Sequence, residues 1–348
     1  MLAAETNVAP LNAAAAKATE INASWRGIVA PVEPFLRAVA QRLAEQVADF
    51  EPAVASHARY ALTNQGKQLR PALVGLSGLA TGGLNDHLVT VAAIIEMVHL
   101  ATLVHDDVMD EARIRRRRPT LAAHSGNTVS VLVGDCLFAH ALQLAAGFPT
   151  TEVCRAVSSA TKTVCSGEII QNQRQHLVRP SRAEYFRMLQ MKTGELFALS
   201  CDLGAGLSGA NLVARAALRD CGMALGTAYQ IFDDCLDLFG SESNAGKSLG
   251  TDLVGGKMTL PIIVALERAG TADQQFLEDA VRAWEPEHHR RLREILDQHG
   301  ALGESANVIR GLCRQARTVL EVLPPTAGRS SLEAATDFVA HQTDTLGR

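Results

Sequence analysis

The chain has 348 residues, and 33 Lys and Arg against 37 Asp and Glu give a formal net charge of −4. A hydrophobic fraction of 47% supplies a sizeable core, and a charged fraction of 20% with only 12 prolines excludes wholesale disorder. The near-neutral charge also excludes a global attraction to nucleic acid, so any anion-binding site must be local.

The cysteine pattern and the N-terminus predict a cytoplasmic location. The seven cysteines are odd in number, form no CxxC pair and lie in apolar stretches, which is typical of reduced thiols. The first residues include Glu5 and lack a basic segment followed by an apolar one, so we expect no signal peptide. The apolar run over 121–148 is interrupted by Asp135 and His140, too early for a membrane span.

The order of residues predicts an all-helical chain. Residues 1–22, rich in Ala, Asn and Thr, are expected to form a flexible N-terminal arm, and residues 23–348 one all-helical domain. Leu, Met, Ala, Glu and Arg dominate the domain, and alternating strand patterns are missing. Glycines and prolines predict helix breaks at 81–83, 147–149, 206–211, 240–256 and 324–325. We therefore predict an all-α fold, a single large bundle of about 10–13 helices around a central substrate cavity.

The first candidate phosphate site lies in the segment GKQLRP, residues 66–71. Lys67 and Arg70 stand three residues apart at the start of a predicted helix, where cations and free backbone amides can hold a phosphate group. Alone this signal is weak, because Lys and Arg usually line solvated faces.

The next predicted helix is apolar and ends in three carboxylates, those of Asp106, Asp107 and Asp110. Asp106 and Asp110 are four residues apart and His99 lies seven residues before Asp106, so these three side chains project from nearly the same face. Like charges at this spacing destabilise a helix, so a buried face of this kind requires compensating positive charge.

A second DDxxD repeats that spacing at Asp233, Asp234 and Asp237, again on an apolar helix. Each motif alone could be a solvated acidic helix end. Two of them favour a cage of carboxylate oxygens between facing helices, and such oxygens suit Mg²⁺, which also takes water and substrate phosphate oxygens as ligands. The pair predicts metal ions that clamp a diphosphate.

Basic residues near both motifs supply the matching positive charge. Five arginines fall within residues 113–118; in isolation they could indicate a nucleic-acid patch, but no aromatic residues interleave them. Their position beside the first acidic motif favours diphosphate oxygens as partners. Lys192, Lys247 and Lys257 add cations later in the chain. Together these residues predict two diphosphate groups beside a metal cluster.

Two diphosphates, Mg²⁺ and an apolar helical interior suit the ionisation of an allylic diphosphate followed by carbon–carbon bond formation. Aromatic residues make up only 4% of the chain, which leaves few rings to hold a long-lived carbocation. We therefore expect a second substrate to consume the cation quickly.

The motifs carry a resemblance to the trans-polyprenyl diphosphate synthases of the isoprenoid synthase class. From about Gly66 to Pro261 the resemblance rests, in order, on GKQLRP, EMVHLATLVHDDVMDEARIRRRRPT, GEIIQ, MKT, YQIFDDCLD and GKSLGTDLVGGKMTLP. The chain departs from the family pattern at Arg117 and Arg118, where the family usually shows Gly and then a basic or small residue. The resemblance implies a Mg²⁺-dependent prenyltransferase that adds isopentenyl diphosphate to an allylic diphosphate by ionisation, condensation and proton elimination.

The resemblance also implies a role for each candidate residue. About three Mg²⁺ ions per active site would be ligated by Asp106, Asp110 and Asp233, with Asp107, Asp234 and Asp237 in or near the metal shell. The allylic diphosphate would be held by Arg115, Lys192, Lys247 and Lys257, and the isopentenyl diphosphate by Lys67, Arg70, His99 and Arg116. The dipoles of Thr193 and Gln230 would face the allylic cation. The family further implies a homodimer. The charge balance and the lack of aromatic residues among the arginines predict no nucleic-acid partner, and an oily substrate predicts peripheral membrane contact for product release.

Product length is predicted from the helix that precedes the first acidic motif. Short-chain members place aromatic rings four to five residues before that motif, where this chain has the small residues Ala101 and Thr102. The motif also lacks the two-residue insertion common in bacterial short-chain enzymes. Each helical turn advances about 5.4 Å, close to one isoprene unit, so Val98 and Met97 would form partial floors one turn deeper. We expect a deep tunnel and a linear all-trans medium- or long-chain product.

Three alternatives remain open from the sequence. A short-chain farnesyl or geranylgeranyl diphosphate synthase would share every motif. A class I terpene cyclase would normally carry an Asn, Ser and Glu pattern in place of the second aspartate motif. A non-catalytic subunit of a heteromeric prenyl synthase should have lost aspartates or phosphate-binding residues, and none is missing here.

Overall fold

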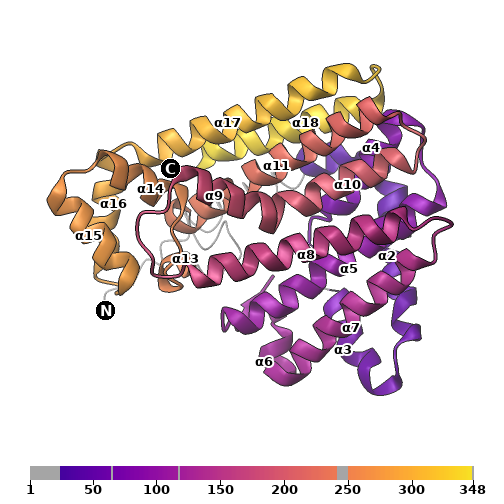
Figure 1. The fold of residues 1–348 in the computed structure, drawn as a ribbon, viewed down its shortest axis with the longest axis horizontal. Coiled ribbons are helices and arrows are strands. Elements are labelled where there is room, and N and C mark those ends of the chain that lie inside the picture. The colour runs from indigo at the N-terminus through magenta and orange to yellow at the C-terminus, as the bar shows by residue number, and fades with distance from the viewer. Residues whose placement is uncertain (1–23, 64–65, 117, 241–249, 347–348) are drawn as a thin grey trace, which may run out of the picture.

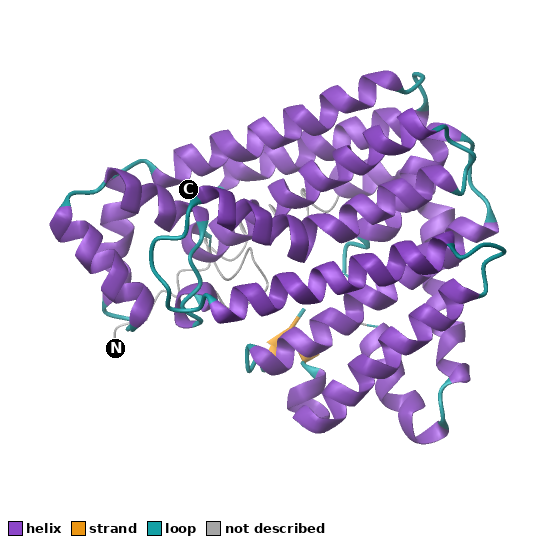
Figure 2. Cartoon of the chain, viewed as in Figure 1, coloured by secondary structure: helices purple, strands orange, loops and turns teal. Residues whose placement is uncertain are grey.

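The computed structural model describes residues 24–63, 66–116, 118–240 and 250–346, and most of them are helical (Figures 1 and 2). The first half contains α2 (Glu33–Glu45), α3 (Pro52–Leu62), α4 (Leu69–Thr81), α5 (Asp86–Met109), α6 (Leu121–Ser125), α7 (Asn127–Ala146) and α8 (Glu152–Gln173). The second half contains α9 (Arg182–Leu189), α10 (Glu195–Gly206), α11 (Leu212–Phe239), α13 (Thr251–Val254), α14 (Leu260–Arg268), α15 (Thr271–Arg282), α16 (His288–Gln298), α17 (Ala301–Val319) and α18 (Ala327–Gln342). The expected N-terminal arm, residues 1–22, lies outside the described residues.

Shorter elements connect these helices. Four 3₁₀ turns lie at η1 (Ala30–Val32), η2 (Gln46–Asp49), η4 (Leu320–Val322) and η5 (Thr343–Thr345). Two two-residue strands, β1 (Ile114–Arg115) and β2 (Arg118–Pro119), pair antiparallel directly after α5. This small hairpin folds the arginine-rich segment back onto the end of α5.

Helix boundaries follow the predicted local signals. The breaks at 81–83, 147–149, 206–211 and 324–325 are confirmed, and the described part of the break at 240–256 contains the short helix α13. Asn85 and Asn211 cap α5 and α11, because each side-chain oxygen accepts a hydrogen bond from a backbone N–H in the first turn. Both long helices that carry an acidic motif therefore start at a fixed residue.

A π turn interrupts one of the helices. α9, the π turn η3 (Gln190–Gly194) and α10 form one continuous helix, and the widened turn contains Lys192 and Thr193. With that helix counted once, the described residues contain thirteen helices of eight residues or more, within the expected range. π turns often mark functional sites, because one extra residue changes the direction of the side chains.

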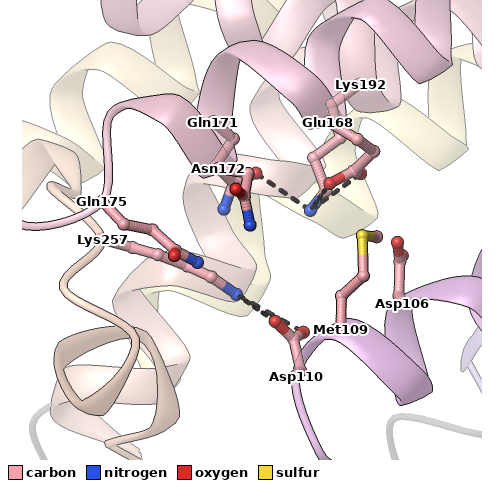
Figure 3. A pocket seen from close by; sticks show the side chains of 9 residues that line it. All are labelled: Asp106, Met109, Asp110, Glu168, Gln171, Asn172, Gln175, Lys192 and Lys257. Atoms are coloured by element: carbon pink, nitrogen blue, oxygen red, sulfur yellow. Dashed lines mark hydrogen bonds and ion pairs between the residues drawn. The ribbon is translucent and has the colours of Figure 1, made fainter.

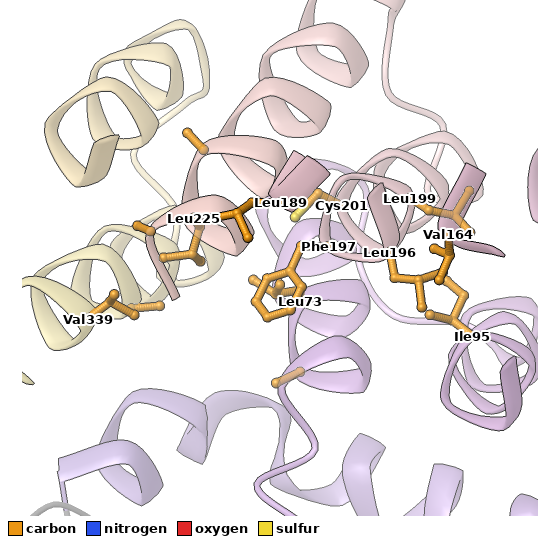
Figure 4. Close-up of a cluster of buried hydrophobic side chains, with 14 of the residues drawn as sticks. Leu73, Ile95, Val164, Leu189, Leu196, Phe197, Leu199, Cys201, Leu225 and Val339 are labelled. Atoms are coloured by element: carbon orange, nitrogen blue, oxygen red, sulfur yellow. The ribbon is translucent and has the colours of Figure 1, made fainter. Parts of the chain in front are cut away.

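The bundle packs around α5, α10 and α11. α5 packs against α7 and α4, and α11 packs against α10 and α17. α17 and α18 run along one side of the molecule, whereas α14, α15 and α16 gather at one end (Figure 1). Buried side chains from α4, α5, α8, α10, α11 and α18 meet between them (Figure 4), among them Leu73, Ile95, Val164, Leu196, Phe197, Leu225 and Val339. This apolar core fixes the relative positions of the two helices that carry aspartates.

In the part of the chain that the structure describes, two helices are long and apolar enough to cross a membrane, α5 and α7. In α5, 72% of the most apolar window is buried inside the protein, which is typical of a core helix. In α7 the share is 39%, and Val131 and Leu132 are exposed on it. α7 thus presents an apolar face that the other described residues leave uncovered.

Candidate active site

The first acidic motif lies at the C-terminal end of α5. Asp107 is buried and turns toward the β1–β2 hairpin, where it accepts a hydrogen bond of 2.6 Å from Arg115 Nε. Asp106 and Asp110 lie one helical turn apart, as their spacing predicts, and line a cavity beside α8. Burial raises the pKa of the Asp106 carboxyl, and nearby Lys192 opposes that shift. The motif therefore divides into one aspartate that holds the hairpin and two that face the cavity.

Two lysines approach this cavity from other elements (Figure 3). Lys192 Nζ, from the π turn, lies 2.9 Å from Glu168 Oε1 and 3.0 Å from Gln171 Oε1 on α8. Burial alone would lower the pKa of Lys192, but the carboxylates of Glu168 and Asp106 raise it above its ordinary value. Lys257 Nζ lies 3.3 Å from Asp110 Oδ1. The cavity thus has cations and carboxylates on facing walls.

The second acidic motif, on α11, divides in the same way. Asp234 is buried and accepts hydrogen bonds from Tyr185 Oη at 2.6 Å and from Gln230 Nε2 at 2.9 Å. Burial raises its pKa to about 7. Asp237 is also buried and accepts a 3.1 Å hydrogen bond from the backbone N–H of Asp252, at the first turn of α13. Asp233 is partly exposed, so of the three it is the aspartate that solvent or a ligand can reach.

Thr193 and Gln230 meet between the π turn and α11. Thr193 Oγ1 donates a 2.7 Å hydrogen bond to Gln230 Oε1. Small residues allow this approach: a Cβ built at Gly226 would lie 3.0 Å from the Cα of Gly194, and one at Gly194 would lie 2.6 Å from Met223 Sδ. Glycine at position 226 therefore allows the two helices to touch, because an added Cβ would also lie 2.9 Å from Phe197 Cβ, and this contact brings the two polar side chains together.

A second basic group gathers where α4 begins. The Arg70 guanidinium is buried, lies 5.0 Å over the Phe197 ring, and has an Nε with no hydrogen-bond acceptor among the described residues. Burial lowers its pKa to about 10, and the buried Glu96 carboxylate opposes that shift. The Arg116 guanidinium rests on Gly66, where a Cβ would lie 2.7 Å from Arg116 Cζ. An unsatisfied buried donor beside a second guanidinium suits an anionic ligand.

The other two residues assigned to the isopentenyl diphosphate are His99 and Lys67. Burial, together with the charges of Arg70 and Arg116, lowers the pKa of His99 well below its usual value, so the imidazole is neutral. Burial also lowers the pKa of Lys67, which Asp233 partly opposes. The structure thus brings together Arg70, Arg116 and His99, three of the four residues that the sequence analysis assigns to one diphosphate. Lys67 lies near Asp233 of the second acidic motif.

Two predicted residues cannot be placed. Lys247, assigned to the allylic diphosphate, and Arg117, the departure from the family pattern, lie outside the described residues.

The fold and the site can now be compared with known proteins. The polyprenyl synthetase family model matches residues 51–299. The chain belongs to this family.

Relatives of known name cover most of the chain. A short chain isoprenyl diphosphate synthase of Methanothermobacter thermautotrophicus is 33% identical over 305 residues, 86% of this chain and 94% of the relative. An octaprenyl diphosphate synthase of Haemophilus influenzae is 30% identical over 301 residues, 86% of this chain and 92% of the relative. A crystal structure of the Caulobacter crescentus polyprenyl synthase, complexed with calcium and isoprenyl diphosphate, has a TM-score of 0.85 at 34% identity and covers 90% of this chain and 96% of that one.

As a polyprenyl synthetase, the chain is a prenyltransferase, and the all-α expectation is confirmed. Three arginines of the run contact other parts of the protein. Arg115 is paired with Asp107, Arg116 rests on Gly66, and Arg118 stacks 3.8 Å from the centre of the Tyr60 ring. These arginines are engaged within the protein.

Several site residues of this polyprenyl synthetase were not identified from the sequence. Glu168 and Gln171 hold Lys192, and they occur in the GEIIQ motif at helical spacing, a signal that could have found them. Tyr185 lies seven residues before Lys192, but the π turn between them removes any simple helical argument. Glu96 is 2% exposed and lies near Arg70. A charged residue within an otherwise apolar helical sequence is the signal that could have identified it.

Proposed function

We propose that this polyprenyl synthetase joins isopentenyl diphosphate to an allylic diphosphate and is Mg²⁺-dependent. The observation that carries the proposal is the presence of two separate cationic groups along α5. One, with Lys192 and Lys257, faces the aspartates at the end of the helix; the other, with Arg70 and Arg116, surrounds His99 two turns earlier. Two diphosphate substrates need two such sites, whereas a cyclase needs one.

The carboxylates that face the cavity fit Mg²⁺. Asp106 and Asp110 line the cavity, and together with the partly exposed Asp233 on α11 they would supply the hard oxygen ligands that this ion prefers. Among the described residues, no three His, Cys, Asp or Glu side chains converge closely enough to hold a metal by themselves. This suits an ion that takes one or two carboxylates from the protein and its other ligands from water and substrate phosphate. We assign it three ions per site only by family resemblance.

The residues divide the reaction between them. When bound, the metal would withdraw negative charge from the leaving diphosphate. Arg115, Lys192 and Lys257 would bind that diphosphate as the allylic carbon–oxygen bond breaks. Arg70, Arg116 and neutral His99 would hold isopentenyl diphosphate so that its double bond attacks the allylic carbon. The new cation then loses a proton, which leaves a product one isoprene unit longer.

Thr193 and Gln230 would face the developing cation. Both present oxygen atoms at the contact between the π turn and α11. Oxygen lone pairs stabilise positive charge without trapping it, in keeping with a cation that reacts quickly.

We propose a medium- or long-chain all-trans product. Met97, Val98 and Ala101 are buried on α5, and small side chains lie near the motif where a short-chain enzyme would need bulk. Relatives named octaprenyl and decaprenyl diphosphate synthase support this range. Another relative is named short chain isoprenyl diphosphate synthase, so the short-chain product is the alternative that experiment must test.

We also propose a homodimer in the cytoplasm. The uncovered apolar face of α7, with Val131 and Leu132 exposed, supports pairing with a second copy, and seven free cysteines support a reducing compartment. Peripheral membrane contact during product release remains a prediction. Light scattering across a concentration series, with a Leu132→Asp variant, tests the dimer.

The function is tested by mass analysis of products. The purified protein is incubated with isopentenyl diphosphate, Mg²⁺ and, separately, dimethylallyl, geranyl, farnesyl or geranylgeranyl diphosphate, each with a chelated control. Linear diphosphates of about six or more isoprene units, absent without metal, are expected. Products that stop at three or four units would favour the short-chain alternative, and release of diphosphate without elongation would contradict the proposal.

A further inference from the structure

Tyr185 stands at the head of a buried chain of hydrogen bonds that leads to the reacting centre. Its hydroxyl donates to Asp234 Oδ2 at 2.6 Å, Gln230 Nε2 donates to Asp234 Oδ1 at 2.9 Å, and Thr193 Oγ1 donates to Gln230 Oε1 at 2.7 Å. Tyr185 is 2% exposed and Asp234 is 5% exposed, so water does not compete for these bonds. The four side chains come from α9, the π turn and α11.

The direction of every bond in this chain is determined by the aspartate. An amide nitrogen only donates hydrogen bonds, so Asp234 Oδ1 accepts from Gln230 Nε2, while Oδ2 accepts from the Tyr185 hydroxyl. The amide nitrogen of Gln230 therefore faces Asp234, which leaves its oxygen toward Thr193. The Gln230 oxygen can only accept a hydrogen bond, so the Thr193 hydroxyl must donate the bond between them. The hydroxyl hydrogen of Thr193 therefore points toward Gln230, and the lone pairs of its oxygen are left for a ligand.

We propose that Tyr185 is a positioning residue for prenyl transfer. Acting through Asp234 and Gln230, it keeps the Thr193 hydroxyl hydrogen in the bond to Gln230, so that the lone pairs of the Thr193 oxygen point toward the allylic carbon. The inference rests on the proposed function, because it assigns Thr193 and Gln230 to the developing cation. It also gives Asp234 a role other than metal ligation, since each of its oxygens accepts a bond from the protein.

A purely structural role is the competing explanation, because a buried carboxylate needs donors wherever it occurs. The two explanations differ in what a substitution changes. Loss of a structural contact lowers stability and acts independently of Thr193. Loss of a positioning contact lowers the turnover rate, and only while Thr193 still has a hydroxyl group to orient.

A double-mutant cycle with Tyr185→Phe and Thr193→Val tests the inference. We expect Tyr185→Phe to lower kcat about 10- to 100-fold with KM for both diphosphates within about twofold of wild type. In the Thr193→Val background, the same change is expected to alter kcat by less than about twofold. Tyr60→Phe, which removes a surface hydroxyl that donates to the Pro119 carbonyl, is the matched control. Equal losses in both backgrounds, an effect confined to KM, or an unchanged kcat would each overturn the inference.

A second measurement needs no turnover. In protein labelled with ¹⁵N at glutamine, the Gln230 side-chain amide, identified by its absence in Gln230→Met, should keep its chemical shift in Thr193→Val, because Asp234 holds the NH₂ group. The chemical shift of the Gln230 amide should change in Tyr185→Phe and stay unchanged in Tyr60→Phe. A signal that moves in Thr193→Val would show that the orientation is set from the other end, and would overturn the inference even if Tyr185→Phe failed to fold. If the wild-type chain made no polyprenyl diphosphate, the proposed function would fail and the amide signals would still report on the orientation of Gln230.

Discussion

The ammonium group of Lys192 forms an ion pair with Glu168, with 2.9 Å between Nζ and Oε1, on the wall of the cavity that faces the first acidic motif. Both side chains are largely buried, at 20% and 17% exposure. The lysine is therefore held in place before any diphosphate arrives, and the carboxylate depends on it for charge compensation.

This ion pair allows structure and catalysis to be separated. Lys192→Met leaves Glu168 without its charged partner and should lower the free energy of unfolding by about 1–3 kcal/mol, together with a large loss of kcat/KM. The double variant Lys192→Met/Glu168→Gln should recover most of the stability and none of the activity. Urea unfolding and the condensation assay measure the two effects, and recovery of activity in the double variant would contradict a direct role for the lysine.

Product length should respond to bulk on α5. Ala101→Phe or Thr102→Phe is expected to shorten the product by at least one isoprene unit, because the ring would occupy the course of the growing chain. Ala101 is fully buried, so its variant should also lose about 1–3 kcal/mol from overpacking. Mass analysis of products measures the change, with Ala183→Phe on the exposed side of α9 as the control. Unchanged chain length in both α5 variants would refute the tunnel assignment.

Stability should fall at mildly acidic pH because of His99. Its folded-state pKa lies well below 6.5, so below that pH the unfolded chain binds a proton that the folded chain rejects. The stabilisation is therefore present above pH 6.5 and lost as the pH falls, with a slope approaching about 1.4 kcal/mol per pH unit. Denaturation of wild type and His99→Gln between pH 7.5 and 5 checks this, and equal slopes for the two proteins would argue against a neutral buried imidazole.

The turn that presents Lys257 should tolerate no side chain at Gly256. This glycine has a φ of +60°, and a Cβ there would lie 2.3 Å from His176 Nδ1, whose backbone N–H also donates to the Gly256 carbonyl at 2.9 Å. Gly256→Ala should raise KM for the allylic diphosphate about tenfold and leave that for isopentenyl diphosphate unchanged. Gly300→Ala, with a φ of +63° and an ordinary contact of 3.7 Å between the added Cβ and Arg268 Nη1, controls for backbone strain alone. Equal rises in both KM values would show a general loss of structure instead.

Much of this arrangement could be predicted from residue order. Glycines and prolines set the helix ends, because their conformational limits act locally, and the i, i+4 spacing was enough to place Asp106 and Asp110 on one face. The other aspartates could not be assigned in this way. Asp107, Asp234 and Asp237 each bond to a residue from a different element, and only the tertiary fold decides which partner lies within reach.

The π turn was also beyond prediction. Gln190 to Gly194 contain ordinary helix-forming residues, and the choice between a regular and a widened turn depends on contacts with neighbouring helices. One such contact is the close approach of Gly167 on α8, where an added Cβ would lie 2.9 Å from the backbone nitrogen of Lys192.

That widened turn makes the active site sensitive to a change of a single residue in chain length. Deleting one residue from Gln190–Gly194 would convert the segment into a regular α-helix, which leaves its helical content intact. Because a π turn closes on residue i+5 and an α turn on residue i+4, the helices on either side would keep their relative direction, and only side chains within the turn would be displaced. Lys192 and Thr193 would lose the direction that the widened turn gives them, so a chain that still folds as a helical bundle would have lost the alignment on which its chemistry depends.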